Sequence, residues 1–218
     1  MHPGYEYDSD YFLNGVRTGK SLYDNYRWIP QLTIPMAQAI AKHLRAEATD
    51  SFLDFGCARG YIVKALKLLG YPVKGFDISP WALQNCDPEV ADDIREELPV
   101  EGADWIIAKD VLEHIEPSEL QSQIFKLVSL ARKGVFIVVP LAERVVIAGG
   151  AVRRYIVPEY EKDVTHKIRR TYNEWLDFLL KSANDKIIVE GTVRVVGVKD
   201  KYFDTHPLGN GFFTLRKF

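Results

Sequence analysis

The sequence predicts a single α/β domain built on a doubly wound, mainly parallel sheet of seven strands with an antiparallel edge strand. From residue 51 onward, short apolar stretches that suit strands alternate with stretches that have the period of amphipathic helices. The strand candidates before residue 140 are almost entirely apolar, which is typical of parallel strands covered on both faces. The last two strand candidates alternate polar and apolar residues, as antiparallel strands at a sheet edge do.

Composition favours an ordinary globular protein. The chain has 218 residues, of which 47% are hydrophobic and 27% charged, so we expect one core and exclude intrinsic disorder. The net charge is -2, so any nucleic-acid surface would have to be local. No stretch approaches the roughly 20 apolar residues that cross a bilayer, and the first residues lack a signal-peptide pattern. With only Cys57 and Cys86 and no zinc-binding spacing, we expect a cytoplasmic protein with no membrane partner.

Residues 1–48 are predicted to form an aromatic and helical cap. The aromatic residues before residue 30 have no clean period, whereas residues 33–47 predict a helix with Pro35 in its first turn. The aromatic residues could pack against the sheet, or they could form a lid that shields a ligand from water. The candidate wall for a substrate consists of Tyr11, Tyr23, Tyr26 and Trp28.

Residues 49–140 are predicted to form the cofactor-binding core. Ser79 can cap a short helix that Pro80 opens, and Ser118 with Gln121 has the pattern of a capping box. The expected strands cover residues 51–55, 73–78, 90–93, 104–108 and 134–139, and the expected helices cover residues 60–69, 80–85 and a segment from residue 118.

The rest of the chain is predicted to contain an insertion and then a closing helix with two strands. Residues 141–170 have few strong periods and are rich in arginine, so we expect an insertion on the substrate side. Residues 171–218 begin with a second capping-box pattern, Thr171 with Glu174. The strands expected to follow that helix cover residues 186–196 and 212–217.

A loop of small residues follows the first predicted strand and opens the next helix. Such a loop lets a ligand approach the backbone and the helix N-terminus closely. A dinucleotide-binding loop that starts at Gly56 would need glycine at positions 58 and 61, but the chain has Ala58 and Tyr61. Asp54 would also repel a pyrophosphate, whereas it would attract a cationic cofactor. Asp77, at the end of the second strand, suits two ribose hydroxyls.

These residues resemble the motifs of class I S-adenosylmethionine-dependent methyltransferases, in the small-molecule branch that includes types 11 and 12. The resemblance covers about residues 50–140, in the order of the family motifs: 53–60, Asp77, 93–99 and 104–115. It implies a Rossmann-like sheet, S-adenosylmethionine as cofactor and S-adenosylhomocysteine as product. Ala58 departs from the family, which usually has glycine there. The implied cofactor-binding residues are Asp54, Gly56, Cys57, Ala58, Gly60, Asp77, Ile78, Asp93 and Lys109.

Two histidines are the candidate catalytic residues. His114 follows the fourth strand, and His166 lies in the insertion; each could act as a general base, or could simply pack. No third ligand can be placed beside them, so no metal is expected. Arg153 and Arg154 are candidates for clamping a substrate carboxylate or phosphate, although a solvated basic surface is the simpler interpretation.

The predicted reaction is in-line methyl transfer to a small molecule, at an oxygen of a sugar-like or other metabolite, because the motifs resemble the small-molecule branch. Three alternatives stay open. They are an RNA or protein methyltransferase that uses Arg153, Arg154, Arg169 and Arg170, a non-catalytic binding module with the same fold, and a nicotinamide-dependent enzyme, which the loop disfavours. The expected partner is a small-molecule acceptor rather than a nucleic acid. The sequence leaves the oligomeric state open.

Overall fold

The structure is a computed structural model that describes residues 3–146, 153–156, 163–183, 185–205 and 209–218. Its centre is a seven-stranded sheet in the order β3-β2-β1-β4-β5-β9-β8. Strands β3 to β5 pair in parallel, and β9 pairs antiparallel with both β5 and the edge strand β8. This confirms the predicted sheet. The strands are β1 (Phe52–Phe55), β2 (Val73–Phe76), β3 (Ile94–Arg95), β4 (Ala103–Lys109), β5 (Ala131–Pro140), β8 (Ile187–Thr192) and β9 (Asn210–Lys217).

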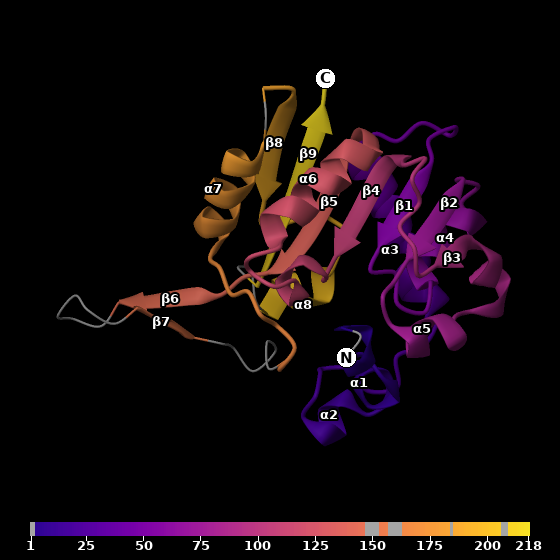
Figure 1. The fold of residues 1–218 in the computed structure, drawn as a ribbon, viewed down its shortest axis with the longest axis horizontal. Coiled ribbons are helices and arrows are strands. Elements are labelled where there is room, and N and C mark those ends of the chain that lie inside the picture. Colours follow the sequence, from indigo (N-terminus) through magenta and orange to yellow (C-terminus); the bar gives the residue numbers. More distant parts are fainter. Residues whose placement is uncertain (1–2, 147–152, 157–162, 184, 206–208) are drawn as a thin grey trace.

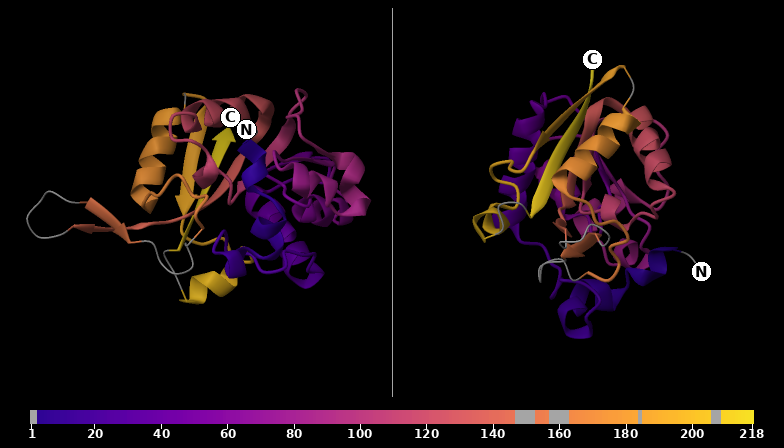
Figure 2. Two further views of the ribbon diagram at one scale, coloured as in Figure 1. Left: turned by 60° about the horizontal axis from the view of Figure 1, so that its bottom comes forward. Right: turned by 90° about the vertical axis from the view of Figure 1, so that its left-hand side faces the viewer.

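Helices cover both faces of the sheet (Figure 1). One face packs against α3 (Pro30–Leu44) and α4 (Tyr61–Leu68), and the other against α6 (Leu120–Leu130) and α7 (Tyr172–Ser182). Strand β4 shows why both faces need cover, because Trp105 and Ile107 face the first helix pair while Ile106 and Ala108 face the second. The right-hand view of Figure 2 shows the two helix layers on opposite sides of the sheet.

The N-terminal segment lies across the carboxyl ends of the parallel strands (Figure 1). It contains the short helices η1 (Pro3–Glu6), α1 (Ser9–Leu13) and α2 (Gly15–Thr18), and we call residues 3–26 the aromatic cap. The Oγ of Ser79 donates a 2.6 Å hydrogen bond to the carbonyl oxygen of Tyr7. Phe12 stacks on Trp81 of α5 (Pro80–Gln84) with ring centroids 5.3 Å apart. The cap is thus fastened to the end of β2 and to α5.

A small two-stranded sheet and a short helix lie between β5 and β9, in addition to α7 and β8. Strands β6 (Glu143–Val146) and β7 (Arg153–Ile156) pair antiparallel in a separate two-stranded sheet, which projects from the body of the protein within the predicted insertion (Figures 1 and 2). A short helix, α8 (Asp200–Thr205), precedes β9. No helix in the described ranges is long and apolar enough to cross a membrane.

The structure corrects the strand predicted at residues 90–93. That segment belongs to a 3-10 helix, η2 (Pro88–Asp93), and β3 follows it with only two residues. Pro88 occupies the first helical turn, and the Asp87 side chain caps the turn by accepting from the N–H of Glu89. The helical start therefore overrides the apolar pattern, which contributes one buried residue, Val90, to the core.

Helix starts also differ from the predictions. The first long helix begins at Pro30, so Pro35 lies inside it rather than in its first turn. The Ser118 capping box does not form, because α6 begins only at Leu120 and its N-cap, Glu119, makes no side-chain cap. The Thr171 capping box is confirmed, since the Thr171 and Glu174 side chains each bond the other's backbone N–H.

Candidate active site

A cavity of about 340 Å³ opens at the carboxyl ends of β1, β2 and β4, under the aromatic cap. The chain reverses its winding direction between β1 and β4, and such a switch point is where open α/β sheets bind ligands. Of the sequence candidates, the cavity brings together Asp54, Gly56, Cys57, Ala58, Asp77, Ile78, Lys109, His114, Tyr11, Tyr23 and Tyr26.

The small-residue loop after β1 is shaped by its glycines. Gly56 has a φ of 79°, and a Cβ atom there would collide with the Val111 side chain. Gly60 has a φ of 80° and caps α4, but a Cβ on it would meet Ile94 and Val90. Gly60 thus supports the turn from beneath and does not line the cavity.

Asp77 binds this loop to the end of the second strand. Its Oδ2 accepts from the N–H of Ala58 at 2.7 Å, and its Oδ1 accepts from the N–H of Ser79 at 2.8 Å. Burial raises the pKa of Asp77 above its ordinary value, while these backbone hydrogen bonds oppose the shift. The carboxylate therefore fixes the loop before any ligand enters.

Asp54 is a buried acid on the cavity wall, with only 3% of its surface exposed. Within the part of the chain that the structure describes, no side chain donates a hydrogen bond to its carboxylate. Burial raises the pKa of Asp54 to about 7, against the attraction of Lys109 and with a further contribution from Asp77. A ligand cation beside Asp54 would supply the missing counter-charge.

Lys109, the last residue of β4, and Asp110, which follows it, form a charged pair. Asp110 has a left-handed φ of 57°, and its carboxylate contacts both Lys109, at 2.6 Å, and Lys199 from the segment before α8. Burial alone would raise the pKa of Asp110, but the two lysines outweigh it and hold the pKa well below its usual range. Lys109 is thus positioned at the cavity wall by a neighbour that neutralises it.

The cap contributes an aromatic wall, and the structure extends the predicted set. Tyr7 and Phe12 line the cavity together with the predicted tyrosines, as do Leu98 and Val111 from the core. Tyr7 follows no helical or strand period that would have distinguished it. Trp28 is not part of this wall, because it packs on Tyr61 while the Lys64 ammonium lies 5.2 Å from its ring centroid.

Asp93 also lies away from the cavity. Its carboxylate pairs with Lys67 at 2.6 Å and with Lys74 at 3.1 Å. Asp93 ends the 3-10 helix, Lys67 lies in α4 and Lys74 lies in β2, so the three elements bring these charges together. Asp93 therefore lies outside this cavity and is paired with two lysines, and its contact with the adenine stays a prediction.

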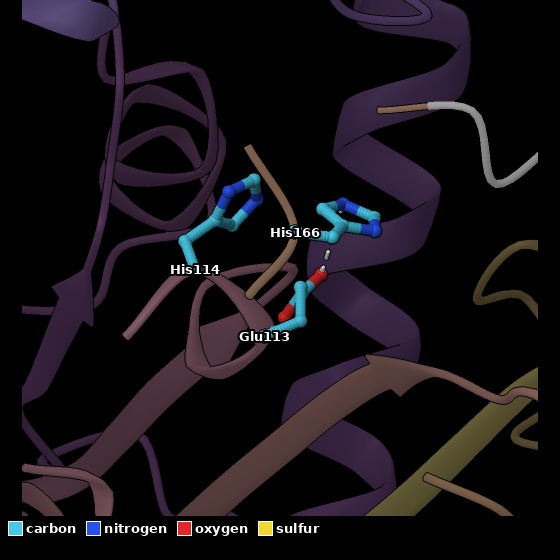
Figure 3. Close-up of side chains that lie close together, drawn as sticks. All are labelled: Glu113, His114 and His166. Atoms are coloured by element: carbon cyan, nitrogen blue, oxygen red, sulfur yellow. Dashed lines mark ion pairs between the residues drawn. The ribbon is translucent and has the colours of Figure 1, made fainter. Parts of the chain in front are cut away.

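The two candidate histidines lie side by side, with ring centroids 4.7 Å apart, as Figure 3 shows. His114 lines the cavity, and its Nδ1 lies 2.9 Å from the Thr165 hydroxyl oxygen. His166 does not line the cavity, and its Nε2 lies 4.0 Å from an oxygen of the buried Glu113. Burial, with a smaller effect of His166, lowers the pKa of His114 to about 4.

Glu113, His114 and His166 contain the atom types that bind transition metals, which the sequence did not predict. One donor atom from each residue lies within 4.8 Å of the others. Ligand atoms held about 2.1 Å from one ion are at most about 4.2 Å apart. The distance of 4.0 Å between His166 Nε2 and a Glu113 carboxylate oxygen falls within that limit.

The predicted arginine cluster is only partly described. The side chains of Arg153 and Arg154 lie outside the described residues, although their backbone forms β7. The Arg170 guanidinium packs over Phe178, 4.1 Å from the ring centroid. Lys167 lines the cavity mouth and pairs with Glu116 at 2.8 Å.

A family model described as a methyltransferase domain matches residues 31–186, which include β1 to β5 and the cavity-lining acids Asp54 and Asp77. The chain belongs to this methyltransferase family. Together with the sheet order and the small-residue loop, family membership confirms the predicted class I, S-adenosylmethionine-dependent methyltransferase with a Rossmann-like fold. Among curated proteins, none has a significant sequence match to this chain.

Solved methyltransferase structures share the fold at low sequence identity. A complex of DhpI with S-adenosylhomocysteine is 14% identical, with a TM-score of 0.58, covering 100% of this chain and 98% of that one. The 1,6-didemethyltoxoflavin-N1-methyltransferase of Burkholderia thailandensis is 17% identical, with a TM-score of 0.53 and coverage of 84% and 76%. The magnesium protoporphyrin IX methyltransferase of Synechocystis PCC 6803 is 14% identical, with a TM-score of 0.53 and coverage of 94% and 83%.

Ala58 generates a test of the methyltransferase loop, because its φ of 48° is left-handed and strained for a residue with a Cβ. We expect Ala58→Gly to change the free energy of unfolding by less than about 0.5 kcal/mol. Glycine relieves about 1–2 kcal/mol of backbone strain at a left-handed φ, and this gain offsets the lost packing of the methyl group and the larger entropy of the unfolded chain. Ala65→Gly, inside α4, should cost about 2 kcal/mol. Urea unfolding measures the stability of both variants. Equal losses of unfolding free energy in Ala58→Gly and Ala65→Gly would contradict the proposed backbone strain at Ala58.

Proposed function

We propose that this methyltransferase transfers a methyl group from S-adenosylmethionine to a hydroxyl oxygen of a small metabolite, with His114 as the base. One observation carries the proposal: Asp54, Asp77 and His114 line a single cavity under an aromatic cap. The acids suit the donor and the histidine suits an acceptor that must lose a proton. The free thiols Cys57 and Cys86 agree with the proposed cytoplasmic location.

The residues at the β1 and β2 ends fit the donor. S-adenosylmethionine supplies an electrophilic methyl group on a cationic sulfonium. Asp54 is a buried acid to which no side chain of the described residues donates a hydrogen bond, so it would hold the cationic methionine end. Asp77 would accept from ribose hydroxyls, and the apolar Ile78 and Leu98 would enclose the adenine. Ala58 lines the same cavity, and its N–H donates to Asp77. Its methyl group would therefore take up space in the cavity while the loop keeps its conformation.

The aromatic cap suits a small acceptor. Tyr7, Tyr11, Tyr23 and Tyr26 close the cavity from the N-terminal side, which leaves limited space and excludes water from the reacting atoms. Two solved neighbours are methyltransferases named for small molecules, 1,6-didemethyltoxoflavin and magnesium protoporphyrin IX, which supports a small-molecule acceptor here. An RNA or protein substrate is less well supported, because Arg170 of the proposed basic surface is engaged on the α7 aromatic residues.

His114 would act on the acceptor hydroxyl. Its low pKa keeps the imidazole neutral at pH 7, so one ring nitrogen has a lone pair for the proton. The remaining requirement is alignment of acceptor oxygen, methyl carbon and sulfur, which the cap and the loop would provide by holding both molecules.

The donor site is tested by calorimetric titration with S-adenosylhomocysteine. We expect Asp77→Asn to weaken binding about tenfold or more, because a carboxylate that accepts from hydroxyls contributes about 1.5–3 kcal/mol. The matched variant Asp93→Asn should bind like the wild type, since Asp93 pairs with surface lysines. NADH serves as the control ligand. Binding of NADH, or equal losses in the two variants, would contradict the assignment.

The pKa of Asp54 predicts a pH dependence of donor binding. Its folded value, about 7, lies above the ordinary value, so the folded protein holds this proton until near neutrality. The ligand-free protein therefore loses stability as pH rises from about 4 to 7, whereas affinity for S-adenosylhomocysteine should increase up to about tenfold per pH unit there. Asp54→Asn should flatten this rise. A smaller rise in affinity should remain in Asp54→Asn, because burial also raises the pKa of Asp77. An unchanged slope would exclude Asp54.

The acceptor class is tested with a panel of phenols, sugars and hydroxy acids beside matched amines, read by release of S-adenosylhomocysteine. We expect hydroxyl acceptors to be methylated and His114→Gln to lower kcat about 100-fold. His43→Gln is the matched control, because His43 lies behind the sheet against Phe136. EDTA should leave activity unchanged. Activity lost with EDTA and restored by Mn²⁺ would contradict the base and favour metal binding at His114.

A further inference from the structure

The turn at residues 163–166 contains a buried polar network directly beside His114. Asp163 has 5% of its surface exposed, and its Oδ1 accepts from both the N–H and the hydroxyl of Thr165. Its other oxygen, Oδ2, accepts from the Tyr11 hydroxyl at 3.1 Å. Thr165 in turn lies 2.9 Å from His114 Nδ1. Three distant parts of the sequence therefore meet in one chain of hydrogen bonds.

The donors in this chain determine where the histidine proton sits. An ionised carboxylate can only accept, so the single hydroxyl hydrogen of Thr165 is directed to Asp163. The Thr165 oxygen can then only accept from His114, which means that Nδ1 carries the hydrogen. The other ring nitrogen, Nε2, is left with its lone pair and is the one that can take a proton.

The cap completes the network. Tyr11 donates to Asp163 and also packs its ring edge-on to His114, with centroids 6.4 Å apart, and Tyr7 packs against the same ring at 5.6 Å. Tyr11 is itself held in the cap, because the Ser21 hydroxyl donates to its carbonyl oxygen. The position of the cap over the cavity and the position of the His114 ring are therefore coupled through Tyr11.

We infer that Tyr11, Asp163 and Thr165 are positioning residues that set the tautomer and orientation of His114, so that seating the aromatic cap also prepares the base. This inference rests on the proposed function. The groups that face His114 are Tyr7 and Tyr11 from the cap, His166 and Asp163 from the turn, and Asp110 after β4. Asp163 supplies the negative charge that stabilises the imidazolium once the proton is taken.

The tautomer can be measured without any acceptor. Two-bond ¹H–¹⁵N correlation spectra of the histidine side chains distinguish Nδ1–H from Nε2–H, and His114→Gln assigns the signal. In the wild type we expect Nδ1–H at His114. Thr165→Val should convert it to Nε2–H or to a mixture, while Thr165→Ser, which keeps the hydroxyl, should restore the wild-type signal. An unchanged tautomer in a folded Thr165→Val protein would overturn the inference.

Turnover tests the contribution of the cap. Tyr11→Phe keeps the ring and removes only the donor to Asp163, so we expect kcat to fall roughly tenfold, while Thr165→Val should lower it roughly 100-fold. Affinity for S-adenosylhomocysteine should stay within about twofold in both variants, because neither residue holds the donor. Tyr71→Phe, at the opposite end of β2, is the matched loss of a tyrosine hydroxyl and should not change kcat. Wild-type kcat in Tyr11→Phe would overturn the role of the cap.

The two proposals fail in different ways. If His114 has the expected tautomer in every variant but no hydroxyl compound is methylated, the proposed function is wrong and the hydrogen-bond network stands. If hydroxyl compounds are methylated with full dependence on His114 but the tautomer ignores Thr165, the positioning inference is wrong and the proposed function stands.

Discussion

The buried carboxylate of Asp77 is the constraint on which the site depends. It accepts from the N–H of Ala58 in the loop after β1 and from the N–H of Ser79 at the start of α5. Ser79 then donates to Tyr7 in the aromatic cap. The loop, the strand end and the cap are therefore connected through Asp77 and Ser79, which only Ile78 separates in the sequence. A polar group buried to this degree is stable only when its hydrogen bonds are made, so the loop conformation and the cap position are coupled to it.

Much of the fold could be predicted because its periods are local. Apolar strands between amphipathic helices gave the seven-stranded sheet, and the Thr171–Glu174 capping box formed as expected. The errors occurred where short-range signals competed. The Val90 segment is apolar enough for a strand, but Pro88 and the Asp87 cap favour a 3-10 turn. Ser118 has a capping pattern, yet the helix begins two residues later. Local patterns locate elements better than they locate boundaries.

The site was predictable to the extent that its chemistry lies at strand ends. Asp54 and Asp77 follow from that rule and line the cavity. Asp93 instead pairs with Lys67 and Lys74, and the sequence alone does not predict these ion pairs. The surroundings of His114 could not be predicted at all. Thr165 is 51 residues away in sequence, and Tyr11 is 152 residues from the Asp163 that it contacts. Such contacts depend on the tertiary fold and leave no periodic trace.

The aromatic cap also has a practical consequence for how the molecule is handled. Figure 1 places the N-terminal end of the chain beside the carboxyl edge of the sheet, and the C-terminal end at the opposite edge, where β9 finishes. A purification tag, fluorescent protein or surface linkage attached before Pro3 would lie close to the cavity, which Glu6 and Tyr7 line. The same attachment after Phe218 would lie away from that cavity, so immobilised or labelled protein should be anchored through β9.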